Sequence, residues 1–143
     1  MRSTTDVVAK FRQLTGQERW LLAQAWLLLL LSDLALRVFP FRTILHDCRR
    51  QQKPQGQQPV DLSVPALRIA WLVEKAGQYC PLGTSCLKEA LVLSRLLARR
   101  GVPTQLRIGV GRQAEAFAAH AWLEQDGRVI LGDRNIEEYA PLL

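Results

Sequence analysis

The dipeptide Asp126-Gly127 lies between two mainly apolar runs, and it restricts the fold more than any other feature of the chain. Asp-Gly is a favoured pair for the two-residue type I′ turn of a β-hairpin. With this dipeptide as the loop, Gln125 faces Arg128 across the hairpin. Counting outward, Leu123 faces Ile130. The turn therefore predicts an antiparallel pair of strands in one defined register.

The same register places His120 opposite Asp133. Directly opposed residues share one face of a sheet, with Cβ atoms about 4.5–5.5 Å apart. At that separation a carboxylate can hold and orient an imidazole ring. A shift of one residue would move the two side chains to different faces, so the pairing depends on the register.

The segment around Cys86 has the pattern of a helix start. Ser85 is a good N-cap, which makes Cys86 the first helical residue. Gly101 and Pro103 end the helix after two arginines, whose charge suits the C-terminal end of the helix dipole. A helix N-terminus favours the thiolate, which is the nucleophilic form of cysteine. The Cys86 N–H can donate to a developing oxyanion, whereas the sequence identifies no second donor.

Cys86, His120 and Asp133 together are the parts of a cysteine nucleophile site: a thiolate attacks, an imidazole moves protons and a carboxylate orients the imidazole. Each residue alone has a plainer interpretation. Cysteine is often a small buried hydrophobe, and a lone histidine among alanines and a tryptophan is often a core residue. The joint placement on one helix start and two strands favours the catalytic interpretation.

Length and composition exclude several classes of function. The 143 residues are enough for one domain with a single core. The net charge is +6, but the basic residues are scattered, so we expect a solvated basic surface and no nucleic-acid partner. Three cysteines are too few for a disulfide framework, which suits a reducing cytosol. The spacing of Cys80 and Cys86 is wider than zinc motifs use, so we expect no metal and no cofactor.

The first long helix begins at a capping box formed by Thr15 and Glu18, and it runs to about Arg37, ahead of Pro40. It is apolar nearly all round and contains the run Leu27–Leu31, so we expect other elements to cover most of its sides. Its uncharged part is shorter than the roughly 20 apolar residues of a membrane-spanning helix, so we expect no membrane span. No signal-peptide pattern precedes it.

The rest of the chain alternates helices with turn signals and ends in strands. A short helical stretch is predicted over 42–49, and a Gln-rich, exposed and mobile loop over 51–59. Ser63 caps a further helix from Val64 to about Ala76. Three strands then form an antiparallel meander, at 105–111, about 117–125 and 128–131. Helices followed by a small antiparallel sheet indicate the α+β class.

Several motifs occur together along the chain: Glu18-Arg19, Phe39-Pro40-Phe41, Cys86-Leu87, Arg99-Arg100-Gly101-Val102-Pro103, Ile108-Gly109-Val110 and Ala119-His120-Ala121-Trp122. In this order they resemble the transglutaminase-like cysteine peptidase of lasso-peptide biosynthesis, which is the leader peptidase part of the B-type maturation protein. The resemblance covers nearly the whole chain. Its most specific parts are the cysteine helix, the Arg-Arg-Gly-Val-Pro segment and the Ala-His-Ala-Trp strand.

The resemblance implies a papain-like or transglutaminase-like core over residues 61–143, with the nucleophile at a helix N-terminus packed on the sheet. Residues 1–60 are then an N-terminal helical region with the Gln-rich loop. It assigns Cys86 as nucleophile, His120 as general base and Asp133 as orienting acid. It also implies a bacterial cytoplasmic enzyme that removes the leader from a ribosomally made precursor peptide.

The resemblance also implies partners. In this family a small recognition protein captures the leader, and a lasso cyclase then closes the freed core peptide. The residues ahead of Thr15 are too few for a fused recognition domain, so we expect a separate one. Its predicted docking surface comprises Trp20, Trp26, Leu27 and Leu30; the alternative is that this helix packs wholly on the nucleophile helix. Two other functions stay open: a transglutaminase-like acyltransferase and a non-catalytic peptide-binding module.

Overall fold

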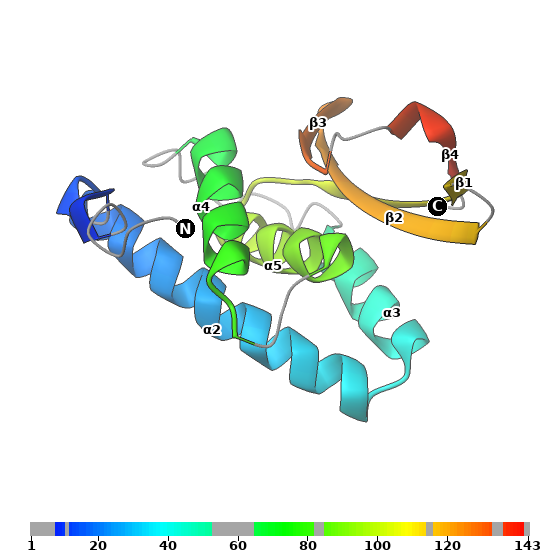
Figure 1. Cartoon of the computed structure of the whole chain (residues 1–143), viewed down its shortest axis with the longest axis horizontal. Coiled ribbons are helices and arrows are strands. Elements are labelled where there is room, and N and C mark those ends of the chain that lie inside the picture. The colour runs from blue at the N-terminus through cyan, green and yellow to red at the C-terminus, as the bar shows by residue number, and fades with distance from the viewer. Residues whose placement is uncertain are drawn as a thin grey trace.

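The computed structural model describes residues 8–10, 12–52, 65–81, 85–113, 116–132 and 136–141. Within these residues, helices lead into an antiparallel four-stranded sheet (Figure 1). The helices are α2 (Gly16–Val38), α3 (Phe41–Gln52), α4 (Ala66–Gln78), α5 (Cys86–Arg99) and the 3₁₀ turn η1 (Ile136–Glu138). The strands are β1 (Gln105–Gln113), β2 (Ala116–Gln125), β3 (Arg128–Leu131) and β4 (Tyr139–Pro141). The order of elements confirms the α+β class.

Helix α2 begins where the capping box predicts. The Thr15 side chain accepts a hydrogen bond from the Glu18 N–H at 3.2 Å, and the Glu18 carboxylate accepts one from the Thr15 N–H at 3.0 Å. Glu18 also forms an ion pair with Arg68 of α4, with Nε and Oε1 2.7 Å apart. The helix ends at Val38, ahead of Pro40 as predicted. The first turn of α2 is thus fixed both to its own cap and to α4.

Helix α4 begins two residues later than predicted. Its N-cap is Pro65, and no side chain caps its first turn. Pro65 has an extended ψ of 144°, so helical geometry begins only at Ala66. The predicted cap and start, Ser63 and Val64, lie outside the described residues.

Helix α3 is longer than the predicted stretch 42–49. It continues to Gln52, and so includes the first residues of the predicted Gln-rich loop. Residues 53–59 of that loop lie outside the described residues.

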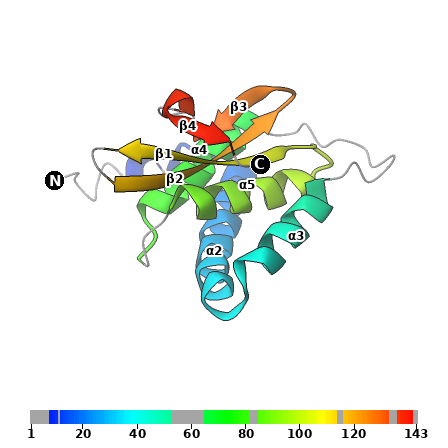
Figure 2. The same ribbon diagram turned by 90° about the vertical axis from the view of Figure 1, so that its right-hand side faces the viewer.

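The sheet has the strand order β3-β2-β1-β4, with α5 along one of its faces (Figure 2). Strands β1, β2 and β3 form the predicted antiparallel meander. Strand β4 pairs with the outer edge of β1, and the sequence pattern did not predict it because its three residues are too few to display an alternation. Ala121 and Leu123 of β2 are buried against the helices.

The hairpin turn between β2 and β3 is as predicted. Asp126 has a φ of 51° and Gly127 a φ of 77°, and a type I′ turn requires positive φ at both central residues. Gln125 pairs with Arg128 next to the turn. The Asp-Gly dipeptide therefore starts the hairpin in the expected register.

The predicted register is wrong beyond the next pair. Leu123 pairs with Leu131, not with Ile130, because an irregularity between residues 123 and 124 leaves Ile130 as the extra residue of a bulge. The predicted pairing of His120 with Asp133 assumes a regular ladder between residues 123 and 124. The observed register therefore does not support that pairing. Asp133 itself lies outside the described residues.

One core joins the helices to the sheet. Its fully buried side chains come from α2, α4, α5 and β2, and include Leu29, Val73, Leu93, Leu97 and Leu123. Helix α2 is therefore packed in the same core as the helix that carries Cys86. This shared core fixes the first turn of α5 against β2, where the candidate site lies.

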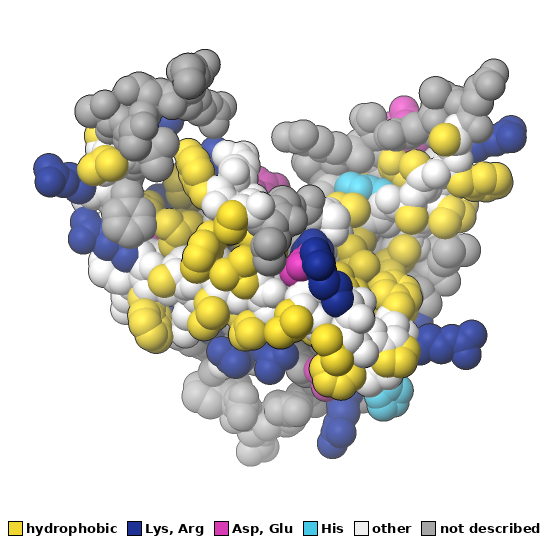
Figure 3. Space-filling model, turned by 60° about the horizontal axis from the view of Figure 1, so that its bottom comes forward, with side chains coloured by type: hydrophobic (Ala, Val, Ile, Leu, Met, Phe, Trp, Pro, Cys, Tyr) yellow, Lys and Arg dark blue, Asp and Glu magenta, His cyan; other side chains and the backbone are white. Residues whose placement is uncertain are grey.

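The outer side of α2 is exposed, contrary to the expectation that other elements cover most of this helix. Five apolar side chains that are half exposed or more recur at helical spacing on this side: Trp20, Leu27, Leu31, Leu34 and Val38. We call these residues the α2 stripe. Figure 3 shows hydrophobic side chains gathered along the α2 side of the molecule. Among the described elements, α4 and α5 pack only on the opposite face, at Leu21, Ala25 and Leu29.

Candidate active site

Cys86 is the first residue of α5, as predicted. Ser85 is the N-cap, and its side chain accepts a hydrogen bond from the Lys88 N–H at 3.4 Å. The half-buried Cys86 side chain lies against β2, where its Sγ accepts a hydrogen bond from the Ala121 N–H at 3.4 Å. The Cys86 N–H lies in the first turn of the helix, where it has no intrahelical acceptor, and it stays the predicted oxyanion donor.

The first turn of α5 is also fixed to α2. The Lys88 ammonium pairs with the Asp33 carboxylate, and Arg37 approaches the same carboxylate with its Nε at 3.0 Å. The hydrogen bond from Lys88 holds the pKa of Asp33 below its ordinary value of 3.8; burial opposes this shift, and the positive charge of Arg37 adds to it. The sequence analysis did not predict this contact. Its sequence signal is a lone acid in an otherwise apolar helix segment, since a buried carboxylate requires a partner.

His120 lies on β2, next in the chain to Ala121, and is half-buried. Its Nε2 lies 2.7 Å from the carbonyl oxygen of Gly132. A carbonyl oxygen can only accept, so Nε2 carries the proton in this contact. In the neutral ring Nδ1 is then left with its lone pair, available as a base.

Two aromatic side chains contact the His120 ring. Trp122 stacks with it, with centroids 6.1 Å apart and an interplanar angle of 26°. Tyr139 of β4 lies closer, at 5.1 Å with an angle of 34°. Gly109 of β1 faces His120 across the ladder, and a Cβ there would come within 2.9 Å of both Trp122 and Tyr139. We call Trp122 and Tyr139 the aromatic pair; the sequence analysis assigned neither to the site.

The structure brings two of the three predicted catalytic residues to one place. The Cys86 thiol lies against the β2 backbone one residue from His120, although among the described residues no hydrogen bond joins the thiol to the imidazole. The third, Asp133, is outside the described residues, and its neighbour Gly132 is the residue that contacts the ring. The arrangement places a thiol at a helix start against the strand that carries a histidine with one fixed nitrogen.

Within the described part of the chain, no group of three or more His, Cys, Asp or Glu residues could hold a metal ion. The thiols of Cys80 and Cys86 are both free and half-buried.

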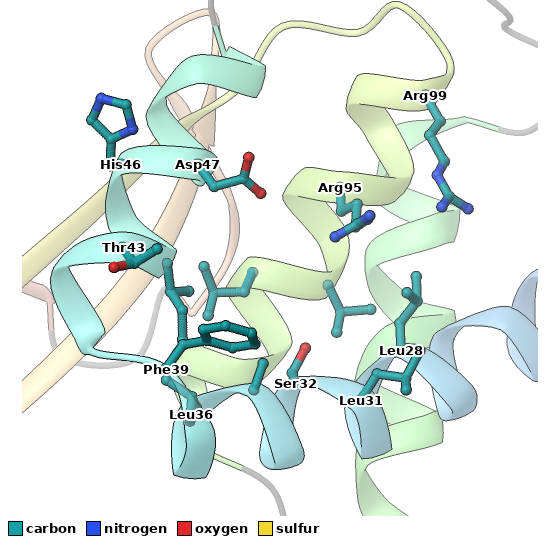
Figure 4. A pocket seen from close by; sticks show the side chains of 14 residues that line it. Leu28, Leu31, Ser32, Leu36, Phe39, Thr43, His46, Asp47, Arg95 and Arg99 are labelled. Atoms are coloured by element: carbon teal, nitrogen blue, oxygen red, sulfur yellow. The ribbon is translucent and has the colours of Figure 1, made fainter.

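A separate hollow of about 560 Å³ lies between α2, α3 and α5 (Figure 4). Most of its lining is apolar, and Arg95 and Arg99 face it from α5. Arg95 is nine residues from Cys86, about 13 Å along the helix at 1.5 Å per residue. The hollow is thus distinct from the thiol site.

Helix α2 is long and apolar enough to cross a membrane, by length and composition alone. A single helix of this kind near the N-terminus is weak evidence for a membrane span, because core helices of soluble proteins meet the same criteria of length and composition. One face of α2 forms the core with α4 and α5, and this packing is compatible with a soluble protein. Of the predicted docking residues, Trp20, Trp26 and Leu27 are exposed and Leu30 is half-buried.

Comparison with known families identifies the domain. No curated protein and no solved structure matches the chain significantly. Residues 26–143 match the family described as the transglutaminase-like superfamily. The matched range includes Cys86, His120 and most of α2, and it extends over far more than half of the sequence. The chain therefore belongs to the transglutaminase-like superfamily.

Proposed function

We propose that this protein is a cysteine peptidase that removes the leader from a ribosomally made lasso-peptide precursor. The observation that carries the proposal is the placement of the Cys86 thiol, at a helix N-terminus, against β2 at Ala121, the residue that follows His120. Membership of the superfamily supports it, because these domains are usually cysteine-dependent hydrolases or transferases. The assignment to lasso precursors rests on the motif resemblance.

The reaction follows from the tautomer of His120. Nε2–H is bonded to the Gly132 carbonyl, so Nδ1 takes the Cys86 proton. The thiolate attacks the carbonyl carbon of the last leader residue, and the Cys86 N–H stabilises the oxyanion. The imidazolium then gives its proton to the departing amine as the C–N bond breaks, which frees the core peptide. Water, deprotonated by His120, hydrolyses the thioester and releases the leader carboxylate.

The remaining assignments are part of the same proposal. Asp133 is the predicted acid of the triad, and the enzyme acts in the bacterial cytoplasm without a metal or cofactor. A separate leader-recognition protein delivers the precursor, and a lasso cyclase acts on the released core peptide. No nucleic acid takes part.

We place the recognition protein on the exposed side of α2, at Trp20, Trp26, Leu27 and Leu30. Leu27 belongs to the α2 stripe, which is an apolar surface that a monomer rarely leaves uncovered. The buried alternative for this helix is not supported, because Trp20 is 66% exposed and Leu27 is 54% exposed.

Alkylation of Cys86 by iodoacetamide, read by peptide mass spectrometry, tests the thiol–imidazole pair. At about pH 7 an ordinary thiol is mostly protonated and reacts slowly. We expect Cys86 to react faster than Cys80, and to lose this advantage in His120→Ala. Equal rates in the wild type and in His120→Ala would contradict the catalytic pair.

Incubation of a lasso precursor peptide with the enzyme and its recognition protein tests the product. Free leader with a carboxylate end supports the peptidase. Leader joined to an added amine would instead identify a transglutaminase-like acyltransferase, because the thioester is then resolved by an amine in place of water. Full biosynthetic function in Cys86→Ala would identify a non-catalytic binding module.

A further inference from the structure

We propose that Phe117 is a specificity-determining residue, and that its exposed ring accepts an apolar side chain of the precursor peptide about four residues from the bond that is cut. This inference deepens the proposed function, and it rests on that function for the role of Cys86 as nucleophile. It gives the precursor an extended conformation along the free side of β2. The sequence analysis assigned no role to Phe117.

The first support is the side of β2 that faces away from β1. Strand β2 has ten residues and β3 has four, and β3 pairs with β2 only over residues 123–125 (Figure 1). Among the described strands, the rest of β2 pairs with β1 alone. A strand edge of this kind presents N–H and C=O groups that an extended peptide can bind as an added strand. We call this side of β2 at Phe117 and Ala119 the open edge.

Cys86 lies on the same side of β2. The Ala121 N–H donates to Cys86 Sγ at 3.4 Å, and the Ala121 carbonyl oxygen lies 2.8 Å from where a Cβ of Gly132 would be. Both groups therefore point away from β1. In an antiparallel ladder alternate residues of a strand point these groups to the same side, so Ala119 and Phe117 present theirs at the open edge. A peptide bound along the open edge thus runs past the nucleophile.

The spacing along β2 decides which precursor residue meets Phe117. Phe117 precedes Ala121 by four residues, which is about 13 Å at roughly 3.3 Å per residue. An extended peptide advances by the same rise, so its residue opposite Phe117 lies about four residues from the carbonyl at Cys86. Directly opposed residues share a face of the sheet, with Cβ atoms about 4.5–5.5 Å apart. The side chain of that precursor residue therefore contacts the Phe117 ring.

The exposure of the ring is the second support. Phe117 is 82% exposed, which is the largest value among the bulky apolar residues that the structure describes, and Ala119 is also exposed. Arg112 of β1 pairs with Phe117, and its guanidinium lies 5.7 Å from the centroid of the ring. The ring adds nothing to the core, but it offers an apolar surface to a bound peptide. The charge of Arg112 disfavours Lys or Arg at the matching precursor position.

Cleavage kinetics of Phe117→Ala test the assignment. We expect KM for a lasso precursor peptide, presented with the recognition protein, to rise about tenfold, while kcat stays within about threefold of the wild type. The ring is remote from the reacting atoms, so its removal weakens binding and not the chemical step. Phe41→Ala is the matched control, since Phe41 is 44% exposed but belongs to α3. An unchanged KM in Phe117→Ala, or equal rises in the two variants, would overturn the inference.

A series of precursor peptides locates the contact. Each peptide carries Leu or Lys at one position, about three to five residues before or after the cut. At one of these positions, exchange of Leu for Lys should raise KM about tenfold in the wild type and less than about threefold in Phe117→Ala. Equal effects of this exchange in both enzymes at every position would show that Phe117 does not contact the peptide.

A readout without catalysis separates this inference from the peptidase proposal. The protein has four phenylalanines, so Cys86→Ala labelled with 4-fluorophenylalanine should give four ¹⁹F NMR signals, and Phe117→Leu identifies one of them. A peptide that spans the cut, with about six residues on each side, should shift the Phe117 signal and leave the Phe41 signal unchanged. This shift without cleavage by the wild type would remove the peptidase proposal and keep the contact. Cleavage by the wild type without this shift would overturn the contact alone. Thermal unfolding of each variant identifies any loss of fold.

Discussion

The start of α5 and the outer side of α2 differ in how their side chains are partnered. At the start of α5, the Cys86 thiol accepts from the Ala121 N–H, Lys88 pairs with Asp33, and His120 contacts a carbonyl and two rings. On the outer side of α2, the stripe residues are exposed, and no described element covers them. The two surfaces belong to one packed body.

This difference separates two uses of side chains. Polar groups that are fixed by partners within the chain are preorganised, which chemistry requires. A row of exposed apolar groups does not stabilise the isolated chain, and it is better explained by contact with another molecule. The predictions below test this division, beginning with the change that should have the largest effect.

Cys86→Ala is expected to lower precursor cleavage by at least about 10³-fold, because in the proposed mechanism the Cys86 thiolate is the nucleophile. The measurement is the rate of leader release by mass spectrometry. Cys80→Ala is the matched control, since Cys80 is the other described free thiol and is equally half-buried. Similar losses in both variants would contradict the assignment of Cys86 as nucleophile.

Two leucines of α2 compare the two faces of that helix. Leu29 is 1% exposed in the core, and Leu29→Ala should lower the free energy of unfolding by about 2–5 kcal/mol. Leu27 is 54% exposed, and Leu27→Ala should change it by less than about 0.5 kcal/mol. Urea unfolding of both variants measures the difference. A large loss in Leu27→Ala would mean that the stripe stabilises the isolated fold.

Leu27→Glu is expected to weaken binding of the leader-recognition protein by about tenfold or more, because it places a charge in an apolar interface. Leu67→Glu is the control, since Leu67 is 66% exposed but belongs to α4 and not to the stripe. Titration calorimetry measures both affinities. Equal affinities of the two variants for the recognition protein would show that the α2 stripe is not part of the interface. Loss of self-association or of vesicle binding in Leu27→Glu would instead identify a second copy or a lipid surface as the occupant.

The parts of the fold that the sequence predicted correctly depend on local signals. The capping box at Thr15, the Ser85 cap and the Asp126-Gly127 turn each involve residues within four positions of each other. Such signals fix where α2, α5 and the hairpin begin. They also place Cys86 at a helix start and His120 on a strand without any knowledge of tertiary packing.

The parts that the sequence did not predict depend on contacts between distant segments. The bulge at Ile130 is a property of the pairing between β2 and β3, and it gives a register other than the one on which the role of Asp133 was predicted. Strand β4 pairs with β1, a segment distant from it in the sequence, so Tyr139 could not be assigned from its own neighbours. Gly132 carried a usable signal, since a glycine directly after a strand often has a positive φ.

The smallest expected effect is at Asp33, where the two regions meet. Asp33 is on the buried face of α2 and pairs with Lys88, two residues from Cys86. The folded state lowers the pKa of this carboxyl, mainly through the Lys88 hydrogen bond, from an ordinary value of 3.8. A lowered folded pKa stabilises the fold above the unfolded value, and this stabilisation is lost as pH falls through the folded pKa. Asp33→Asn should therefore be less stable than the wild type at neutral pH, and the two should converge well below pH 3.8.

Urea unfolding of both proteins over a pH series measures this convergence. Arg37→Gln is the control, because the Arg37 side chain is 70% exposed and its removal leaves the Lys88 pair intact. Arg37→Gln should keep most of the wild-type dependence of stability on pH. A constant difference in stability between the wild type and Asp33→Asn at every pH would contradict a stabilising role for the Asp33 charge. The alkylation rate of Cys86 in Asp33→Asn adds a second result. If that rate falls while the protein remains folded, the contact of α2 with α5 controls the position of the nucleophile, and a partner bound on the α2 stripe has a physical route to the active site.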